Sequence, residues 1–255
     1  PIEAAAKSGG GALFVSGVDP GWGNDILPIL LTGLAGTIDQ IRCQEIFDYT
    51  TYDQHDSVRY LVGMGQPMDY EPPMVAATVP TMVWGGQIRL IARALGVELD
   101  EIRETLLRRP LDETITTDLM GEFEAGTQGA LRFEVQGIVD GEALIVIEHV
   151  TRIHPSCAPP DWPVPPDGGD GAHKVIIEGR PRIEMNVEAT DEGGNRAAGG
   201  NAPRWGAWST RSRGCGRRAG ALRRLDVPLT PPVTASSADT TQRGTPPRGP
   251  HLALC

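Results

Sequence analysis

The fold of this chain is constrained most by residues 16–25, Ser-Gly-Val-Asp-Pro-Gly-Trp-Gly-Asn-Asp. An apolar run, Ala12–Val15, precedes this segment, and an apolar pattern with helical spacing, Ile26–Leu34, follows it. Pro20 fixes the φ angle that a turn needs, and Gly21 tolerates a positive φ. The segment therefore predicts the order strand, tight turn, helix.

The turn in this segment is also a candidate binding site. Asn24 is a good N-cap residue, and Asp25 is favourable in the first turn of a helix. Because a helix N-terminus attracts anions, a substrate carboxylate could bind at the residues around the turn: Asp19, Pro20, Gly21 and Asn24. A plain structural turn is the alternative that the local pattern leaves open.

The remaining pattern predicts helices first and strands after. Apolar spacing favours helices over residues 2–7, 25–35, 56–62 and 82–95, and strands over residues 38–49, 131–139, 144–153, 174–177 and 183–189. Asp140-Gly141 is a hairpin turn signal between two of these strands. We expect an α+β fold with a mainly antiparallel or mixed sheet and helices on one face.

Composition excludes several classes of protein. Residues 1–195 hold 13 basic and 31 acidic residues, a balance of −18 that argues against nucleic acid as a partner. No apolar run approaches the length of a membrane-spanning helix, so no membrane partner is expected. The histidines show no metal-ligand spacing, which predicts no metal. The four cysteines are far apart, as is typical of reduced thiols in a cytoplasmic protein.

Several motifs together resemble a family of NAD(P)-dependent reductases. They are the Gly-Val-Asp-Pro-Gly turn, the segments Glu45–Tyr49, Gly63–Gly65 and Ala94–Val97, and the strands up to Asn201. They are similar to dihydrodipicolinate reductases and, more closely, to 2,4-diaminopentanoate dehydrogenase-like proteins. The resemblance implies a substrate-binding and oligomerisation domain over residues 12–202, with residues 1–11 as the end of a dinucleotide-binding domain.

The resemblance also implies an activity. We expect hydride transfer between a small amine, imine or amino-acid-like substrate and NAD or NADP, in an enzyme that self-associates through its sheet. The chain contains no Gly-x-Gly-x-x-Gly, so the main cofactor motif is expected before Pro1. Asn201 matches the asparagine of the family's last helix and is the candidate cofactor contact. The alternative is a non-catalytic fragment that acts only as a self-association module.

Candidate catalytic residues lie in and after the strand over residues 38–49. Tyr52 and His55, in a polar loop, are candidate acid–base groups, although a solvated histidine at a helix start is the commoner case. Glu45 matches the first position of the dihydrodipicolinate reductase motif Glu-x-His-His, but the two histidines are absent, which disfavours that substrate. Arg152, at a strand end, is a candidate carboxylate clamp, although a sheet-edge arginine is commoner.

The tail, residues 203–255, loses all apolar periodicity. Pro203–Gly214 can be written in GC-rich codons whose neighbouring reading frame gives Ala-Val-Gly-Arg-Leu-Val-Asn-Ala-Ile-Pro-Gly, a helix of the type that the related families have here. Leu225–Pro231 again resembles the family ending. These patterns lead to the hypothesis of an irregular, frameshifted tail that begins near Ala202.

A frameshift is directly testable. The coding DNA should show a one-base insertion or deletion near the codon for Ala202, and limited proteolysis should cut first among residues 204–224. A clean DNA sequence that encodes these residues, together with a protease-resistant tail, would contradict the hypothesis.

Overall fold

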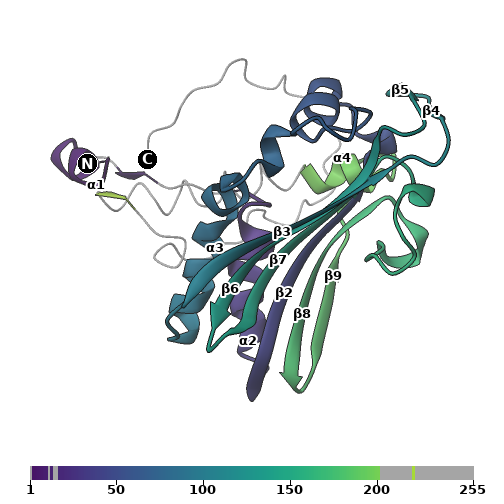
Figure 1. Ribbon diagram of the computed structural model, residues 1–255. Coiled ribbons are helices and arrows are strands. Elements are labelled where there is room, and N and C mark those ends of the chain that lie inside the picture. The colour runs from purple at the N-terminus through teal and green to yellow at the C-terminus, as the bar shows by residue number, and fades with distance from the viewer. Residues whose placement is uncertain (1, 11, 14–16, 202–219, 222–255) are drawn as a thin grey trace, which may run out of the picture. The chain divides into compact units, whose positions relative to one another are not determined.

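The computed structural model describes residues 2–10, 12–13, 17–201 and 220–221 (Figure 1). The compact unit that carries the sheet spans Val18–Pro203. A second unit contains helix α1 (Ile2–Ser8) and strand β1 (Ala12–Leu13), which pairs in parallel with β10 (Gly220–Ala221). Apart from β10, the tail hypothesis concerns residues that lie outside the described ranges.

A six-stranded mixed sheet forms the centre of the main unit. Its strand order is β3-β6-β7-β2-β8-β9, and every neighbouring pair is antiparallel except β2 and β7, which are parallel. The bounds are β2 (Thr37–Asp48), β3 (Glu101–Pro110), β6 (Gln128–Val139), β7 (Glu142–Arg152), β8 (Gly171–Arg180) and β9 (Ile183–Val187). The predicted α+β fold with a mixed sheet is confirmed.

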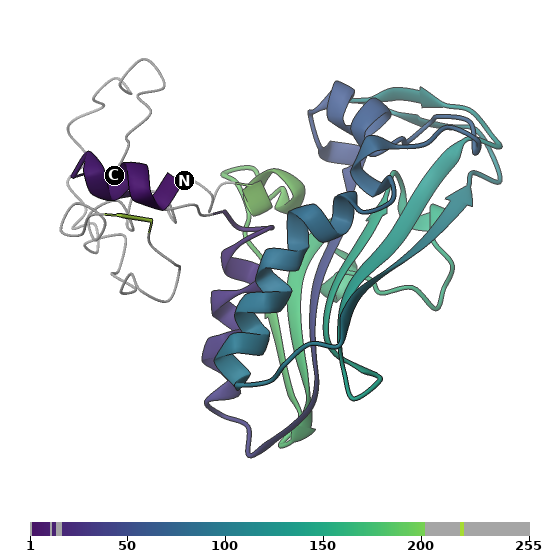
Figure 2. The ribbon, with the colours of Figure 1, turned by 60° about the vertical axis from the view of Figure 1, so that its left-hand side comes forward.

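Two long helices cover one face of this sheet. Figure 2 shows α2 (Ile26–Thr32) and α3 (Val79–Leu95) lying side by side along that face. The shorter elements are η1 (Trp22–Asn24), η2 (Tyr49–Thr51), the π-helix η3 (Ser57–Leu61), η4 (Pro73–Val75), the hairpin β4 (Ile115–Thr117) and β5 (Gly121–Phe123), η5 (Pro155–Cys157), η6 (Pro166–Gly168) and α4 (Arg196–Asn201). The expected helices on one face are therefore present.

The start of α2 lies one residue later than the sequence predicts. Asp25, rather than Asn24, is its N-cap, and the Asp25 carboxylate accepts the N–H of Ile26 at 2.5 Å. Asn24 belongs to η1 instead, and its Oδ1 accepts the N–H of Gly21 at 2.8 Å. The Asn24 side chain thus closes the turn, which leaves Asp25 to cap the helix.

The start of α3 is capped by a residue from a distant strand. The Glu104 carboxylate, on β3, accepts the N–H of Thr78 at 3.1 Å and the N–H of Thr81 at 2.7 Å. This cap lets the helix begin at Val79, three residues before the predicted start. The predicted end at Gly96 is confirmed, because Gly96 adopts a left-handed φ of 72° as the C-cap.

Strand β3 is the one long strand that the sequence analysis misses. It lies at an edge of the sheet and is mostly exposed, so its residues alternate only weakly between apolar and polar. Without a buried face, a strand leaves no clear period-two signal.

The core lies between the helices and the sheet. Branched and aromatic side chains from both layers are almost completely buried there, among them Ile41, Ile88, Ile91, Phe133, Ile145 and Ile147. Removing this apolar surface from water stabilises the two layers against each other. The same packing fixes which side chains of the sheet face the helices.

A charge network lies on the opposite, helix-free face of the sheet. Glu148, on β7, is fully buried, and its carboxylate accepts from Arg42 Nη1 and Arg132 Nε, each at 2.6 Å. Gln44 Nε2 donates to the same carboxylate at 2.8 Å, and Glu134 pairs with Arg42 at 2.7 Å. The buried negative charge of Glu148 is thus matched by two arginines, the condition under which a buried carboxylate is tolerated.

Replacing Glu148 should therefore destabilise the fold strongly. Glu148→Gln removes a negative charge that Arg42 and Arg132 share and leaves them with Glu134 alone, so it should lower the free energy of unfolding by about 3 kcal/mol. Glu101→Gln, which breaks an exposed pair with Arg103, should cost about 0–1 kcal/mol. Urea denaturation of both variants measures the difference, and equal losses would show that the network is not a structural constraint.

Candidate functional site

Four side chains form a row across the helix-covered face of the sheet. In the strand register, Glu45 on β2 lies opposite both His149 on β7 and His173 on β8, and Phe133 on β6 lies opposite His149. Directly opposed residues point to the same face of a sheet. The neighbouring row on that face is Cys43, Ile147 and Val175, all in the apolar core. Glu45, His149 and His173 therefore lie next to the apolar core, at its border.

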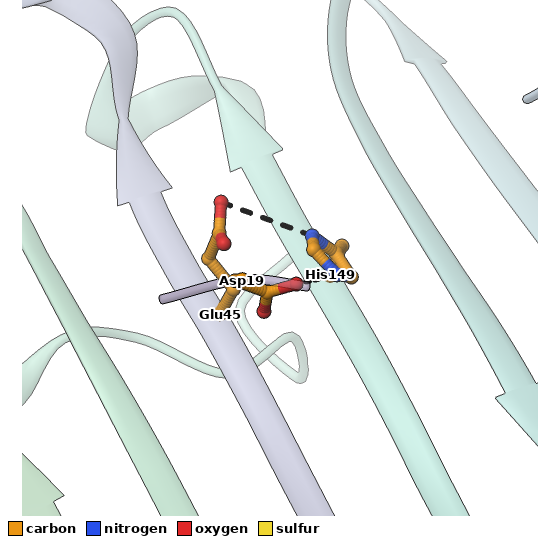
Figure 3. Close-up of side chains that lie close together, drawn as sticks. All are labelled: Asp19, Glu45 and His149. Carbon is orange, nitrogen blue, oxygen red and sulfur yellow. Dashed lines mark ion pairs between the residues drawn. The ribbon is translucent and has the colours of Figure 1, made fainter. Parts of the chain in front are cut away.

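The turn after Gly17 adds a second carboxylate to this row. The Asp19 side chain is only 4% exposed, and its Oδ1 accepts from Trp84 Nε1 of α3 at 2.6 Å. The same oxygen lies 3.4 Å from His149 Nε2 (Figure 3). A Cβ built at Gly23 would lie 3.4 Å from the His173 ring, so the turn packs directly on the row.

Glu45 connects the two histidines. Its Oε1 lies 3.8 Å from His149 Nδ1, and its Oε2 lies 3.6 Å from His173 Nε2. Asp19, His149, Glu45 and His173 therefore form a continuous series in which carboxylates and imidazoles alternate. We call these four residues the acid–imidazole cluster.

Aromatic rings enclose the cluster. The His149 ring stacks on Phe133 with centroids 4.6 Å apart and an interplanar angle of 5°, and Trp84 lies 4.6 Å from the same ring. Phe47 meets His173 edge to face at 5.3 Å. With so little water around them, the charges of the cluster interact more strongly than they would at the surface.

The cluster changes the proton affinities of its members. Burial alone would lower the pKa of His149, but the carboxylates of Asp19 and Glu45 outweigh burial and raise it. The pKa of His173 is likewise raised, by Glu45 first, against the effect of burial. For Asp19, burial opposes ionisation, yet the charge of His149 and the Trp84 hydrogen bond hold the pKa well below its usual range. The site therefore joins a stable anion to imidazoles that hold protons readily.

The structure brings some of the candidate residues from the sequence together. Asp19 and Glu45 both belong to the cluster, while Pro20, Gly21 and Asn24 form the turn that holds Asp19 in place. Tyr52, just after η2, stacks on Tyr49 at 4.8 Å. Burial and the nearby charge of Glu45 raise the pKa of Tyr49 well above its usual value.

Two other candidates, His55 and Arg152, lie outside the cluster. His55 is about half exposed, and its charged neighbour is Asp53 at 3.7 Å. Arg152 lies on the helix-free face, since it directly opposes Asp48 and follows Val150 by two residues. It is 3% exposed, and burial lowers its pKa against the charge of Asp48. This position separates Arg152 from Glu45 and His149 by the thickness of the sheet.

Asn201 is the last residue of α4. Asp170, just before β8, anchors this helix because its carboxylate accepts the N–H of Arg196 at 3.2 Å and of Ala197 at 3.4 Å. The Asn201 side chain lies outside the described part of the structure. Its predicted cofactor contact therefore stays a prediction.

The sequence analysis missed His149, His173 and Trp84. His149 follows Glu148 inside an otherwise apolar strand, and two adjacent polar residues there were the available signal. Nothing local links His149 to Asp19 or Glu45, because the strand register alone brings them together. Asp19, Glu45 and His149 each place one potential ligand atom within 4.8 Å of the other two. This grouping could hold a metal ion.

The start of helix α2 does not suit the phosphates of a dinucleotide. α2 follows a turn, but the Asp25 carboxylate occupies its N-terminus, where it would repel a phosphate. Within the described residues, no helix is long and apolar enough to cross a membrane.

The raised pKa of His149 makes a prediction about stability. A group whose pKa is raised by folding contributes stability that is complete below about pH 6.5 and is lost as pH rises through the folded-state pKa. The free energy of unfolding should therefore fall above pH 6.5, and less steeply in His149→Gln. Urea denaturation from pH 6 to pH 9 measures this slope, with His55→Gln, outside the cluster, as the control. An unchanged slope in His149→Gln would contradict the charge pairing.

Two known proteins are similar to this chain, one in sequence and one in fold. A protein from Streptomyces virginiae described as an amine dehydrogenase is 70% identical over 239 residues, covering 91% of this chain and 65% of that protein. The solved structure of an amine dehydrogenase from Mycobacterium smegmatis shares the fold, with a TM-score of 0.62 at 13% identity. The match covers 89% of this chain and 62% of that one.

A family model connects the site to these relatives. The model of the 2,4-diaminopentanoate dehydrogenase C-terminal domain matches residues 24–201, which include Glu45, His149 and His173. The match spans all six strands of the sheet and both covering helices. This chain therefore belongs to the family of the 2,4-diaminopentanoate dehydrogenase C-terminal domain.

Proposed function

We propose that this chain supplies the substrate-binding and acid–base part of an NAD(P)-dependent oxidoreductase that acts on small amines. One observation carries the proposal: Asp19 is a buried carboxylate with a strongly lowered pKa, placed among aromatic rings and two histidines. The family and the description of the Streptomyces relative support the same class of activity. The chain spans 65% of the length of that relative.

The charge of the cluster favours a cationic substrate group. A protonated amine can donate a charge-assisted hydrogen bond to the Asp19 carboxylate. Trp84, whose ring lies 4.6 Å from that of His149, and Phe133, which stacks on the same imidazole, supply apolar walls. An amine of small size therefore finds both of its needs at one place, an anion and apolar walls.

The same charges disfavour a substrate carboxylate. Asp19 and Glu45 both carry acidic groups toward the site, so an anionic substrate group would meet repulsion there. Arg152, the candidate clamp for a carboxylate, lies on the other face of the sheet. Of the amine and amino-acid-like substrates expected from the resemblance, we therefore propose amines without a carboxylate.

His149 is the residue best placed to move a proton. An ammonium group must lose a proton before its carbon can lose a hydride, and His149 Nε2 lies beside the Asp19 oxygen that would bind that group. Glu45, at Nδ1 of the same ring, stabilises the imidazolium that forms. NAD(P) would supply the hydride acceptor.

Amine binding tests the charge argument on the chain itself. Calorimetry should detect binding of 2-aminopentane, and Asp19→Asn should weaken it by at least about tenfold, because a charge-assisted hydrogen bond is lost. Norvaline, which adds a carboxylate to a similar carbon chain, should bind more weakly. Asp39→Asn, at an exposed acid on β2, is the matched control. Tighter binding of norvaline, or unchanged binding in Asp19→Asn, would contradict the proposal.

Turnover tests the assignment of the acid–base groups. In a protein that joins this chain to an NAD(P)-binding domain, His149→Gln should lower kcat by about 100-fold, the usual worth of a positioned acid–base group. His55→Ala and Tyr52→Phe test the groups chosen from the sequence. A loss of kcat in His55→Ala, with normal kcat in His149→Gln, would move the proton transfer to the polar loop. Self-association through the sheet stays a separate prediction.

A further inference from the structure

We propose that the acid–imidazole cluster is also a divalent-metal site, which binds Zn²⁺ through Asp19, Glu45 and His149. Metal binding itself does not depend on the proposed function. The effect of zinc on activity rests on the proposed function: a Zn²⁺ ion at Asp19 would occupy the place of the substrate amine, so zinc is a competitive inhibitor.

The spacing of the three residues is close to that of a tetrahedral zinc site. Zinc ligands lie about 2.0–2.1 Å from the metal, so two ligands of a tetrahedron are about 3.3 Å apart. Asp19 Oδ1 and His149 Nε2 are already 3.4 Å apart. All three residues place a ligand atom within 4.8 Å of the others, so Glu45, whose Oε1 lies on the Nδ1 side of the His149 ring, must approach by up to about 1.5 Å. Its long side chain, 18% exposed, has the freedom to do so.

A second observation points to a missing ligand. The His149 side chain is only 5% exposed, and its Nε2 is buried. This atom nevertheless makes no hydrogen bond to any described residue. Buried polar atoms are almost always hydrogen-bonded, and those that are not call for a partner that the protein itself does not provide. The 3.4 Å contact with Asp19 is an ion-pair distance without hydrogen-bond geometry. A metal ion between these two atoms would satisfy both.

The surroundings of the cluster resemble a supporting shell. Trp84 Nε1 donates to Asp19 at 2.6 Å and holds the orientation of this carboxylate. His173 lies 3.6 Å from the Glu45 oxygen that faces away from His149. Groups in such positions orient metal ligands and raise affinity in known metal sites.

The donor set favours zinc over harder cations. One imidazole with two carboxylates suits Zn²⁺, whereas Mg²⁺ and Ca²⁺ prefer six or more oxygen ligands. Three protein ligands also leave a fourth position open for water. Cys43 lies in the next row of the same face, within the apolar core.

Titration of the full chain with Zn²⁺ and with Co²⁺ tests the site. Calorimetry should show zinc binding that Asp19→Asn, Glu45→Gln and His149→Gln each weaken at least tenfold, with no binding of Mg²⁺. His55→Gln and Asp53→Asn change an exposed histidine–acid pair and should leave the affinity unchanged. Co²⁺ in the chain should give the visible absorption of a tetrahedral site.

X-ray absorption of the zinc-loaded chain needs no variant and keeps the test sound if a variant fails to fold. It should show oxygen and nitrogen ligands with one imidazole. Sulfur ligands, absent zinc binding, or binding that only the His55 and Asp53 variants weaken would overturn the metal site. Amine binding that persists without zinc binding overturns this inference alone. Zinc binding without amine binding overturns the proposed function instead.

Discussion

The parallel pairing of β2 with β7 is the constraint on which both faces of the sheet depend. On one face it sets Glu45 against His149, and on the other it sets Arg42 and Gln44 within reach of Glu148. A slip of one residue would send every side chain of β2 to the wrong face. The buried Glu148 would then lose its arginines while His149 lost its carboxylate, so a single register protects the ion network and the site together.

Two buried carboxylates of this fold, Glu148 and Asp19, are balanced in different ways. Glu148 receives two arginines and a glutamine, which together satisfy its oxygens. Asp19 receives one indole N–H and a histidine that is too poorly aligned to donate to it. Its lowered pKa means that folding favours the ionised carboxylate, although its pairing within the described residues is incomplete. An incompletely paired anion of this kind attracts a cation from outside.

The sequence predicted the elements that carry strong periodicity, and the site only in part. Apolar spacing located β2, α3, β6 and β7, and the Asp-Pro-Gly turn located Asp19. It missed β3, an exposed edge strand with no buried face to reveal it. The face of Arg152 and the neighbours of Glu45 follow from the register between strands, which one sequence does not encode locally. His55 was chosen because it lies in a polar loop after a strand. That criterion does not indicate whether a side chain is buried, and His55 is exposed.

The sign of the charge at the turn reverses the first interpretation of this segment. A helix N-terminus after a glycine turn suggested a site for an anion, yet the protein's own acids fill it: Asp25 caps α2, and Asp19 lies under Trp84. The positive end of the helix dipole thus stabilises the Asp25 carboxylate instead of a substrate carboxylate. The charge that Asp19 and Glu45 offer to a ligand is negative. An amine and a zinc ion are both cations, and in the two proposals the imidazole of His149 distinguishes them, because it takes a proton from the amine and binds the zinc directly.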